Sequence, residues 1–335
     1  MTRDHRARWY RAGLLIIKGV AVLVVSGGLL LAPVGGSSTS SELLLSPYLP
    51  RTAHQAYGYT LAQARLSRPP ARDWLLSSER AIFSPANTDL PLDAQGRFDS
   101  GQPDALGLRF TARSGQRVYI EVETEPDGSP EEASVFVDLF AADSVQPQLI
   151  ESSPPSRPTA SGAIHRRLEL AVLEPSGYVL RVQPTLGYSG DYRVSVRTAP
   201  LLAFPVEGMD TRAIQSGFGA ERDGGARAHR GVDIFAPRGT SALAAMDSWV
   251  SRVETTTRGG NVVWLQPLFG NMRLYYAHLD TQLVQPGDFV LAGEAVGTVG
   301  NTGNAITTPP HLHFGVYLRR RGMRGGARDP YPFLD

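Results

Sequence analysis

The 335-residue chain contains no cysteine. This absence excludes disulfides, a thiolate metal ligand, a cysteine nucleophile and a lipid-modified cysteine behind a signal sequence. Any metal bound by this chain must therefore be held by histidine, aspartate, glutamate or backbone oxygen. The chain also lacks an excess of either charge, with 33 Lys and Arg against 32 Asp and Glu. No global electrostatic field therefore indicates nucleic acid as a partner.

The chain begins with a pattern typical of export. An apolar run of 19 residues extends from Leu14 to Ala32, with Lys18 as its single charged residue, and four arginines precede it. That length is enough to span a bilayer, and it also suits the core of a signal peptide. Positive charge ahead of the run places the N-terminus in the cytoplasm. We therefore expect residues 1–36 to be a hydrophobic helix, either a signal peptide or an anchor in the inner membrane. The rest of the chain is then expected outside the cytoplasm, in the periplasm or elsewhere in the cell envelope.

The middle of the chain changes from helical to strand patterns. Residues 37–96 begin as a Gly/Ser/Thr linker and continue with two short stretches of helical spacing, 53–66 and 69–83. From residue 97 to 200, short segments alternate apolar and polar residues between turns, which predicts an antiparallel β-sandwich. Residues 97–198 resemble a small jelly-roll, the bacterial pre-peptidase C-terminal domain. That resemblance implies binding or positioning and no catalytic role.

Residues 201–335 carry four of the seven histidines, each in its own short phrase. In "TPPHLHFGVYL" the residues alternate as in a strand, so His311 and His313 share one face while Leu312 and Phe314 face the core. Two imidazoles on one face of a strand can serve one site. Two exposed histidines on a sheet edge would give the same pattern, so this phrase alone leaves both interpretations open.

A second phrase, "HRGVDIFAPRGT", places a histidine and an aspartate four residues apart where glycine and proline disfavour a helix. We expect His229 on a loop and Asp233 on the short strand that follows. This is not the His-Glu-x-x-His helix of other zinc proteases, which the chain lacks. Taken alone, a turn histidine and a strand aspartate explain the phrase as well. The third phrase, "NMRLYYAHLD", predicts a strand over 272–279 with His278 near its end and a turn at 280–282.

Taken together, these residues are chemically suited to one metal site. Two imidazoles and one carboxylate make a three-ligand site for Zn²⁺ that leaves a fourth position open. Such a site keeps a net charge of about +1, which lowers the pKa of a water bound to the ion. Two histidines then remain to move a proton or to stabilise a developing oxyanion.

The phrases resemble, in order and spacing, the LytM/lysostaphin-type zinc metallopeptidases, whose fold is the duplicated hybrid motif. The resemblance covers nearly all of residues 201–320, and its "H-x-x-x-D", "Y-x-H-L-D" and "H-L-H-F" motifs are intact. It implies that His229, Asp233 and His313 bind Zn²⁺. It also implies that His278 and His311 form the catalytic pair around the attacked carbonyl. The resemblance, and not the spacing, selects His313 over His311 as the ligand.

The resemblance also implies a function. Members of this family cut short peptides in bacterial peptidoglycan, so we expect peptidoglycan as the partner and a zinc endopeptidase that hydrolyses its cross-links or stem peptides. The alternative is a catalytically silent protein of the same fold that binds the wall or activates another hydrolase. The expected fold is mainly β: an antiparallel sandwich at 97–200 and an antiparallel β-sheet metallopeptidase domain at 201–335, with a hydrophobic helix at the N-terminus.

Overall fold

The computed structural model describes residues 24–25, 28–29, 52–63, 69–127, 134–143, 146–153, 163–268, 271–318 and 326–334. The chain divides into two compact units, Met1–Arg51 and Thr52–Asp335. Within the first unit, β1 (Val24–Val25) and β2 (Gly28–Leu29) form an antiparallel pair. The expected N-terminal hydrophobic helix otherwise lies outside the described residues. In the described part of the chain, no helix combines the length and apolar character needed to cross a membrane.

The second unit begins with two helices, α2 (Ala53–Gln63) and α3 (Pro69–Phe83), where the helical spacing predicts them. Two prolines open α3, a position where the missing N–H costs nothing. Trp74 is buried and its indole Nε1 donates to the carbonyl oxygen of Pro184 at 2.7 Å. A Cβ at Gly107 would lie 2.2 Å from the carbonyl oxygen of Ala81, so glycine is what lets α3 approach the sheet this closely.

A buried polar network joins these helices to the sheet beneath them. Asp138 and Arg181 form an ion pair at 2.6 Å, and Arg181 also donates to Ser78 Oγ at 2.8 Å. The His54 ring lies 2.6 Å from Gln183 Oε1 and stacks on an indole ring. Burial, and next the charge of Arg181, lower the pKa of His54 to about 4, so its imidazole is neutral in the folded protein at neutral pH.

We expect the docking of these helices to weaken in mild acid. The unfolded chain protonates His54 near its ordinary pKa of 6.5, while the folded chain does so only near 4. The contribution of His54 to the free energy of unfolding is therefore constant above pH 6.5. It decreases by about 1.4 kcal/mol per pH unit as the pH falls toward 4. Urea unfolding at a series of pH values measures this, and His54→Gln should remove that part of the slope. His165→Gln, at an exposed histidine, is the control and should keep the wild-type slope. Equal slopes for wild type and His54→Gln would contradict the expectation.

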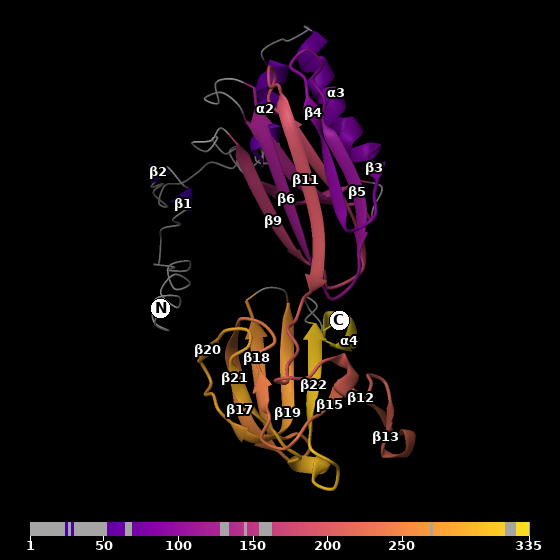
Figure 1. Cartoon of the computed structure of the whole chain (residues 1–335), viewed down its shortest axis with the longest axis vertical. Helices are drawn as coiled ribbons and strands as arrows, with labels where there is room; N and C mark the ends of the chain where they lie inside the picture. Colours follow the sequence, from indigo (N-terminus) through magenta and orange to yellow (C-terminus); the bar gives the residue numbers. More distant parts are fainter. Residues whose placement is uncertain are drawn as a thin grey trace, which may run out of the picture. The chain divides into compact units, whose positions relative to one another are not determined.

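The next nine strands form a two-sheet sandwich (Figure 1). Its first sheet has the order β3-β5-β10-β7-β8, with bounds Ala86–Asn87, Leu106–Ala112, Ser176–Pro184, Val135–Ala141 and Gln148–Ser153. Its second sheet has the order β4-β11-β6-β9, with bounds Leu92–Phe98, Gly190–Pro200, Gln116–Pro126 and Ile164–Ala171. Apart from the parallel pair β3 and β5, the described pairings are antiparallel.

One apolar core fills the space between the two sheets. Phe110, Leu139 and Leu180 from the first sheet share it with Ile120 and Val194 from the second. These residues are almost fully buried because alternate side chains of each strand point to the same inner face. The predicted antiparallel sandwich is therefore confirmed, and its strands begin with β3 and β4, ahead of residue 97.

The C-terminal part of the chain is a ten-stranded antiparallel sheet. Its main path runs β12-β15-β22-β19-β18-β17-β20, with bounds Ile214–Ser216, Val232–Phe235, His311–Leu318, Met272–Gln282, Gly260–Pro267, Ser248–Thr256 and Phe289–Val290. Three strands pair beside this path: β16 (Ser241–Leu243), β21 (Ala295–Val299) and β23 (Gly326–Arg328). A separate short hairpin consists of β13 (Glu221–Arg222) and β14 (Arg227–Ala228). Short helical turns lie at η3 (Thr211–Ala213), η4 (Asp223–Gly225), η5 (Gly303–Ala305) and α4 (Tyr331–Leu334). The mainly β, antiparallel fold class is confirmed.

Strand β19 differs from its prediction in a way that shapes the site. The strand continues to Gln282 instead of ending at residue 279. His278 adopts a φ of 62°, the one left-handed non-glycine conformation among the described residues, and its N–H donates to Gly259 O at 2.8 Å. Before this residue β19 pairs with β22, whereas Leu279 pairs with Val299 of β21. A backbone strained at one residue thus transfers the strand from one partner to another, and the alternation of apolar residues does not predict such a change.

Candidate active site

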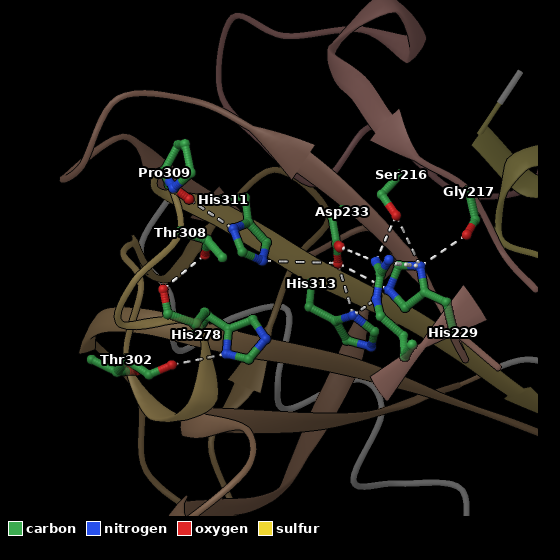
Figure 2. A network of polar contacts seen from close by, with 12 residues as sticks. Ser216, Gly217, His229, Asp233, His278, Thr302, Thr308, Pro309, His311 and His313 are labelled. Carbon is green, nitrogen blue, oxygen red and sulfur yellow. Dashed lines mark hydrogen bonds and ion pairs between the residues drawn. The ribbon is translucent and has the colours of Figure 1, made fainter. Parts of the chain in front are cut away.

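Pairing within the C-terminal sheet brings the predicted site residues together (Figure 2). Strands β15 and β22 pair so that Asp233 lies opposite His313, and Phe235 lies opposite His311. His229 follows β14 directly and lies on the loop before β15, as the sequence predicts. Asp233 and His313 are therefore cross-strand neighbours whose side chains project from the same face of the sheet.

Three side-chain atoms form a nearly equilateral triangle. His229 Nε2 lies 2.9 Å from His313 Nδ1 and 3.0 Å from Asp233 Oδ1, and His313 Nδ1 lies 3.0 Å from the same oxygen. Four tetrahedral ligands at 2.0–2.1 Å from an ion are about 3.3 Å apart, so this triangle is close to the spacing that a small divalent cation requires. His229 and Asp233 are buried, and His313 is partly exposed.

The three atoms of this triangle do not carry enough protons to hydrogen-bond one another. His229 Nδ1 lies 2.8 Å from Gly217 O, and a carbonyl oxygen only accepts, so Nδ1 carries the proton and the Nε2 lone pair faces the triangle. Burial would raise the pKa of Asp233, but its contacts with His229 and His313 lower that pKa well below its usual range, so the carboxylate is ionised. These two acceptors, His229 Nε2 and Asp233 Oδ1, lie 3.0 Å apart and face His313 Nδ1, which can supply one proton. A cation at the centre would satisfy all three atoms, so these residues fit a bound metal.

The two remaining histidines lie beside the triangle with their rings oriented by the backbone. His278 Nδ1 lies 2.9 Å from Thr302 O, and His311 Nδ1 lies 2.9 Å from Pro309 O. Both rings therefore carry their proton on Nδ1 and leave the Nε2 lone pair free. Their centroids are 5.1 Å apart, and His311 Nε2 lies 3.9 Å from Asp233 Oδ1. All five residues expected at the site are thus brought together.

The environment keeps one of these imidazoles neutral. His278 is 8% exposed. Burial first, and then the nearby His311 and His313, lower the pKa of His278 to about 4. A neutral imidazole with a free Nε2 is a proton acceptor at neutral pH. The pair beside the triangle can therefore accept a proton from a nucleophile or donate one to a leaving group.

Gly231 is required by the close approach of the loop to β22. A Cβ at this position would lie 2.3 Å from Phe314 O and 2.9 Å from His313 Nε2, distances at which neighbouring atoms must move. We expect Gly231→Ala to displace the His313 ring and to weaken metal binding about 10- to 100-fold. Metal titration against a competing chelator measures this. Gly326→Ala is the matched control, since a Cβ there meets only one atom, at 3.9 Å. Wild-type metal affinity in Gly231→Ala would contradict the expectation.

Two kinds of group that contact the site were not predicted from the sequence: the Arg222 side chain and several backbone carbonyl oxygens. Arg222 Nη2 donates to Asp233 Oδ2 at 2.7 Å, and it also donates to Ser216 Oγ at 2.6 Å. Arg222 stands in "ERDGG", a stretch whose visible signal is its turn glycines. The carbonyl oxygens that orient the histidine rings were missed as well, because a backbone oxygen carries no sequence signal.

Comparison with known proteins identifies the domain that contains this site. Residues 227–328 match the model of peptidase family M23. Peptidoglycan DD-endopeptidase ShyC of Vibrio cholerae is 35% identical over 131 residues, 38% of this chain and 29% of that protein. Glycyl-glycine endopeptidase ALE-1 of Staphylococcus capitis is 38% identical over 107 residues, 32% of this chain and 29% of that protein.

This chain thus spans less than a third of the length of each of these two relatives. Among solved structures, the catalytic domain of lysostaphin from Staphylococcus simulans is 35% identical. The similarity covers 35% of this chain and 88% of that one, with a TM-score of 0.32. The resemblance predicted from the histidine phrases is confirmed by the family match. Residues 227–328, which carry the five clustered side chains, are therefore a peptidase family M23 domain.

Proposed function

We propose that this chain is a zinc-dependent endopeptidase that hydrolyses peptide bonds of bacterial peptidoglycan, in cross-links or in stem peptides. The observation that carries the proposal is the triangle of His229, Asp233 and His313 atoms beside two imidazoles with free Nε2 atoms. Membership in peptidase family M23 supports it, as do relatives named as a peptidoglycan DD-endopeptidase and a glycyl-glycine endopeptidase.

In this proposal the three triangle residues hold Zn²⁺, a metal that two imidazoles and one carboxylate suit. When bound, the ion would polarise the scissile carbonyl and increase the acidity of the attacking water. His311 and His278 then handle the proton: one Nε2 accepts it from the water, and the pair returns it to the leaving amine.

The proposed substrate also implies a location and a division of the chain. Peptidoglycan lies outside the cytoplasm, so we propose a place in the cell envelope, with residues 1–36 as signal peptide or anchor. Residues 37–96 would then link this segment to a sandwich at 97–200 that positions the enzyme. Residues 201–335 would form the metalloendopeptidase domain.

A catalytically silent wall-binding or hydrolase-activating protein is the second function to weigh. A silent member of such a family needs neither an intact ligand set nor oriented catalytic bases. Here the three ligand atoms lie within 4.8 Å of one another, and both further histidines have the same ordered tautomer. These observations favour the enzyme.

Digestion of purified peptidoglycan sacculi tests the proposal. The purified chain is incubated with sacculi as prepared, after treatment with a chelator, and after zinc is added back. Mass spectrometry of the released fragments identifies the bond that is cut. We expect release of new peptide ends, its loss with chelator and its recovery with zinc. Binding to sacculi without any release would favour the silent alternative, and cleavage that the chelator leaves intact would exclude a metal-dependent reaction.

A further inference from the structure

We propose that Arg222 is a positioning residue that keeps one oxygen of the Asp233 carboxylate away from the metal. This inference rests on the proposed function of the site. It concerns a residue outside the triangle and the two catalytic histidines. The two oxygens of the Asp233 carboxylate contact different partners, the two imidazoles on one side and Arg222 on the other.

Asp233 faces two different groups with its two oxygens. Oδ1 belongs to the triangle, 3.0 Å from each imidazole nitrogen. Oδ2 accepts from Arg222 Nη2 at 2.7 Å. The side chains are 10% exposed for Asp233 and 28% exposed for Arg222, so water competes little for this contact. A charge-assisted hydrogen bond in such a place orients the carboxylate strongly.

The backbone holds Arg222 where this contact needs it. Arg222 lies in β13 and pairs with Arg227 of β14. His229 lies two residues after Arg227 in the chain. The pairing continues past the hairpin, because His229 N donates to Ala220 O at 2.8 Å and Gly219 N donates to His229 O at 2.9 Å. The segment that carries Arg222 and the segment that carries a metal ligand are therefore one hydrogen-bonded unit.

Ser216 provides a second acceptor for the same guanidinium nitrogen. Arg222 Nη2 donates to Ser216 Oγ at 2.6 Å, and Ser216 lies opposite Asp233 in the pairing of β12 with β15. Nη2 also lies 3.2 Å from His229 Nδ1, but that nitrogen already donates to a carbonyl and a guanidinium offers no lone pair. This last approach is therefore a packing contact and not a hydrogen bond.

Two consequences follow for the metal site. With Oδ2 held by Arg222, the carboxylate would offer a single oxygen to a bound ion and would leave room for water and substrate. The guanidinium also draws charge from the carboxylate, which would leave more positive charge at a bound ion for polarising a carbonyl. Without Arg222, the freed Oδ2 could rotate toward the ion and occupy a position that the reaction needs.

Arg222→Gln in the whole chain tests this inference, and Co²⁺ replaces Zn²⁺ as a visible probe of coordination number. We expect the variant to bind about one Co²⁺ but to show visible absorption at least about twofold weaker, because the ion gains a ligand. On a purified cross-linked muropeptide with saturating zinc, we expect kcat to fall about 10- to 100-fold and KM to change less than about threefold. Arg212→Gln, at an arginine whose side chain is 90% exposed, is the matched control and should behave as wild type.

Two further variants keep the test decisive. Arg222→Lys offers one point charge in place of a fork, and we expect intermediate absorption and kcat. Ser216→Ala removes the second acceptor, and we expect a smaller change in the same direction. Wild-type absorption and kcat in Arg222→Gln would overturn the inference; if that variant fails to fold, the same result in both Arg222→Lys and Ser216→Ala would overturn it. A wild-type chain that binds no metal would instead refute the proposed function itself.

Discussion

Alanine at Asp233 or at His313 is expected to reduce the zinc content of the purified chain from about one ion to nearly none. Each substitution leaves two protein ligands where a stable catalytic zinc site uses three. The Asp233 change has a further cost, because it removes the anion that balances the ion and the partner of the Arg222 guanidinium. Peptidoglycan hydrolysis should disappear together with the metal.

Metal analysis after exhaustive dialysis measures this loss, with digestion of sacculi as the second readout. His165→Ala is the matched control, because the His165 side chain is 59% exposed in the sandwich and its Nε2 lies 3.5 Å from a glutamate carboxylate. It should retain wild-type zinc and activity. Full zinc content in both the Asp233 and His313 variants would show that the triangle is not the metal site.

Alanine at His278 or at His311 is expected to give the opposite combination, with about one zinc ion retained and activity lost. Neither Nε2 belongs to the triangle, so its removal leaves the three ligands in place. Each imidazole is oriented by a backbone carbonyl, and under the proposed function each would act as a positioned acid or base, which contributes about 10²- to 10⁴-fold to the rate. We therefore expect kcat to fall by about that factor in each variant.

The His278 and His311 variants are compared by zinc content and by the rate of fragment release from sacculi. His311 also stacks on Phe235, with ring centroids 5.0 Å apart, so Phe235→Leu tests whether loss of packing alone reduces the rate. A small effect in Phe235→Leu beside a large one in His311→Ala would assign the loss to the imidazole. Wild-type digestion by His278→Ala and His311→Ala would show that the catalytic pair lies elsewhere.

Several local features were predictable from residue patterns because their causes are local. Alternation along "HLHFGVYL" places His311 and His313 on one face of β22, as the structure has them. Gly231 and Pro237 disfavour a helix after His229, and the short strand that carries Asp233 follows as expected. The helical spacing at 53–66 and 69–83 likewise predicts α2 and α3, with the first of them ending at Gln63.

Other features depend on contacts between distant parts of the chain. The left-handed His278 occurs where β19 leaves β22 for β21, and no residue type near it indicates this change of partner. Arg222 reaches Asp233 only because a hairpin folds back beside the loop of His229. Thr302 O, which orients His278, comes from a loop that crosses Gly260 so closely that a Cβ there would lie 2.4 Å from the Thr302 carbonyl carbon.

The sequence by itself therefore determined the chemical types of the site residues, their faces on the local strands and the family of the domain. The alternation of side chains along a strand and the preference of glycine for turns act over a few residues, so both can be predicted from the sequence alone. Only the tertiary structure decided that atoms of His229, Asp233 and His313 meet within 3.0 Å and that Arg222 holds the outer oxygen of Asp233. It also decided which nitrogen of His229, His278 and His311 carries the proton. These properties arise from strand register and backbone carbonyl positions, which are set by pairing between segments up to 84 residues apart.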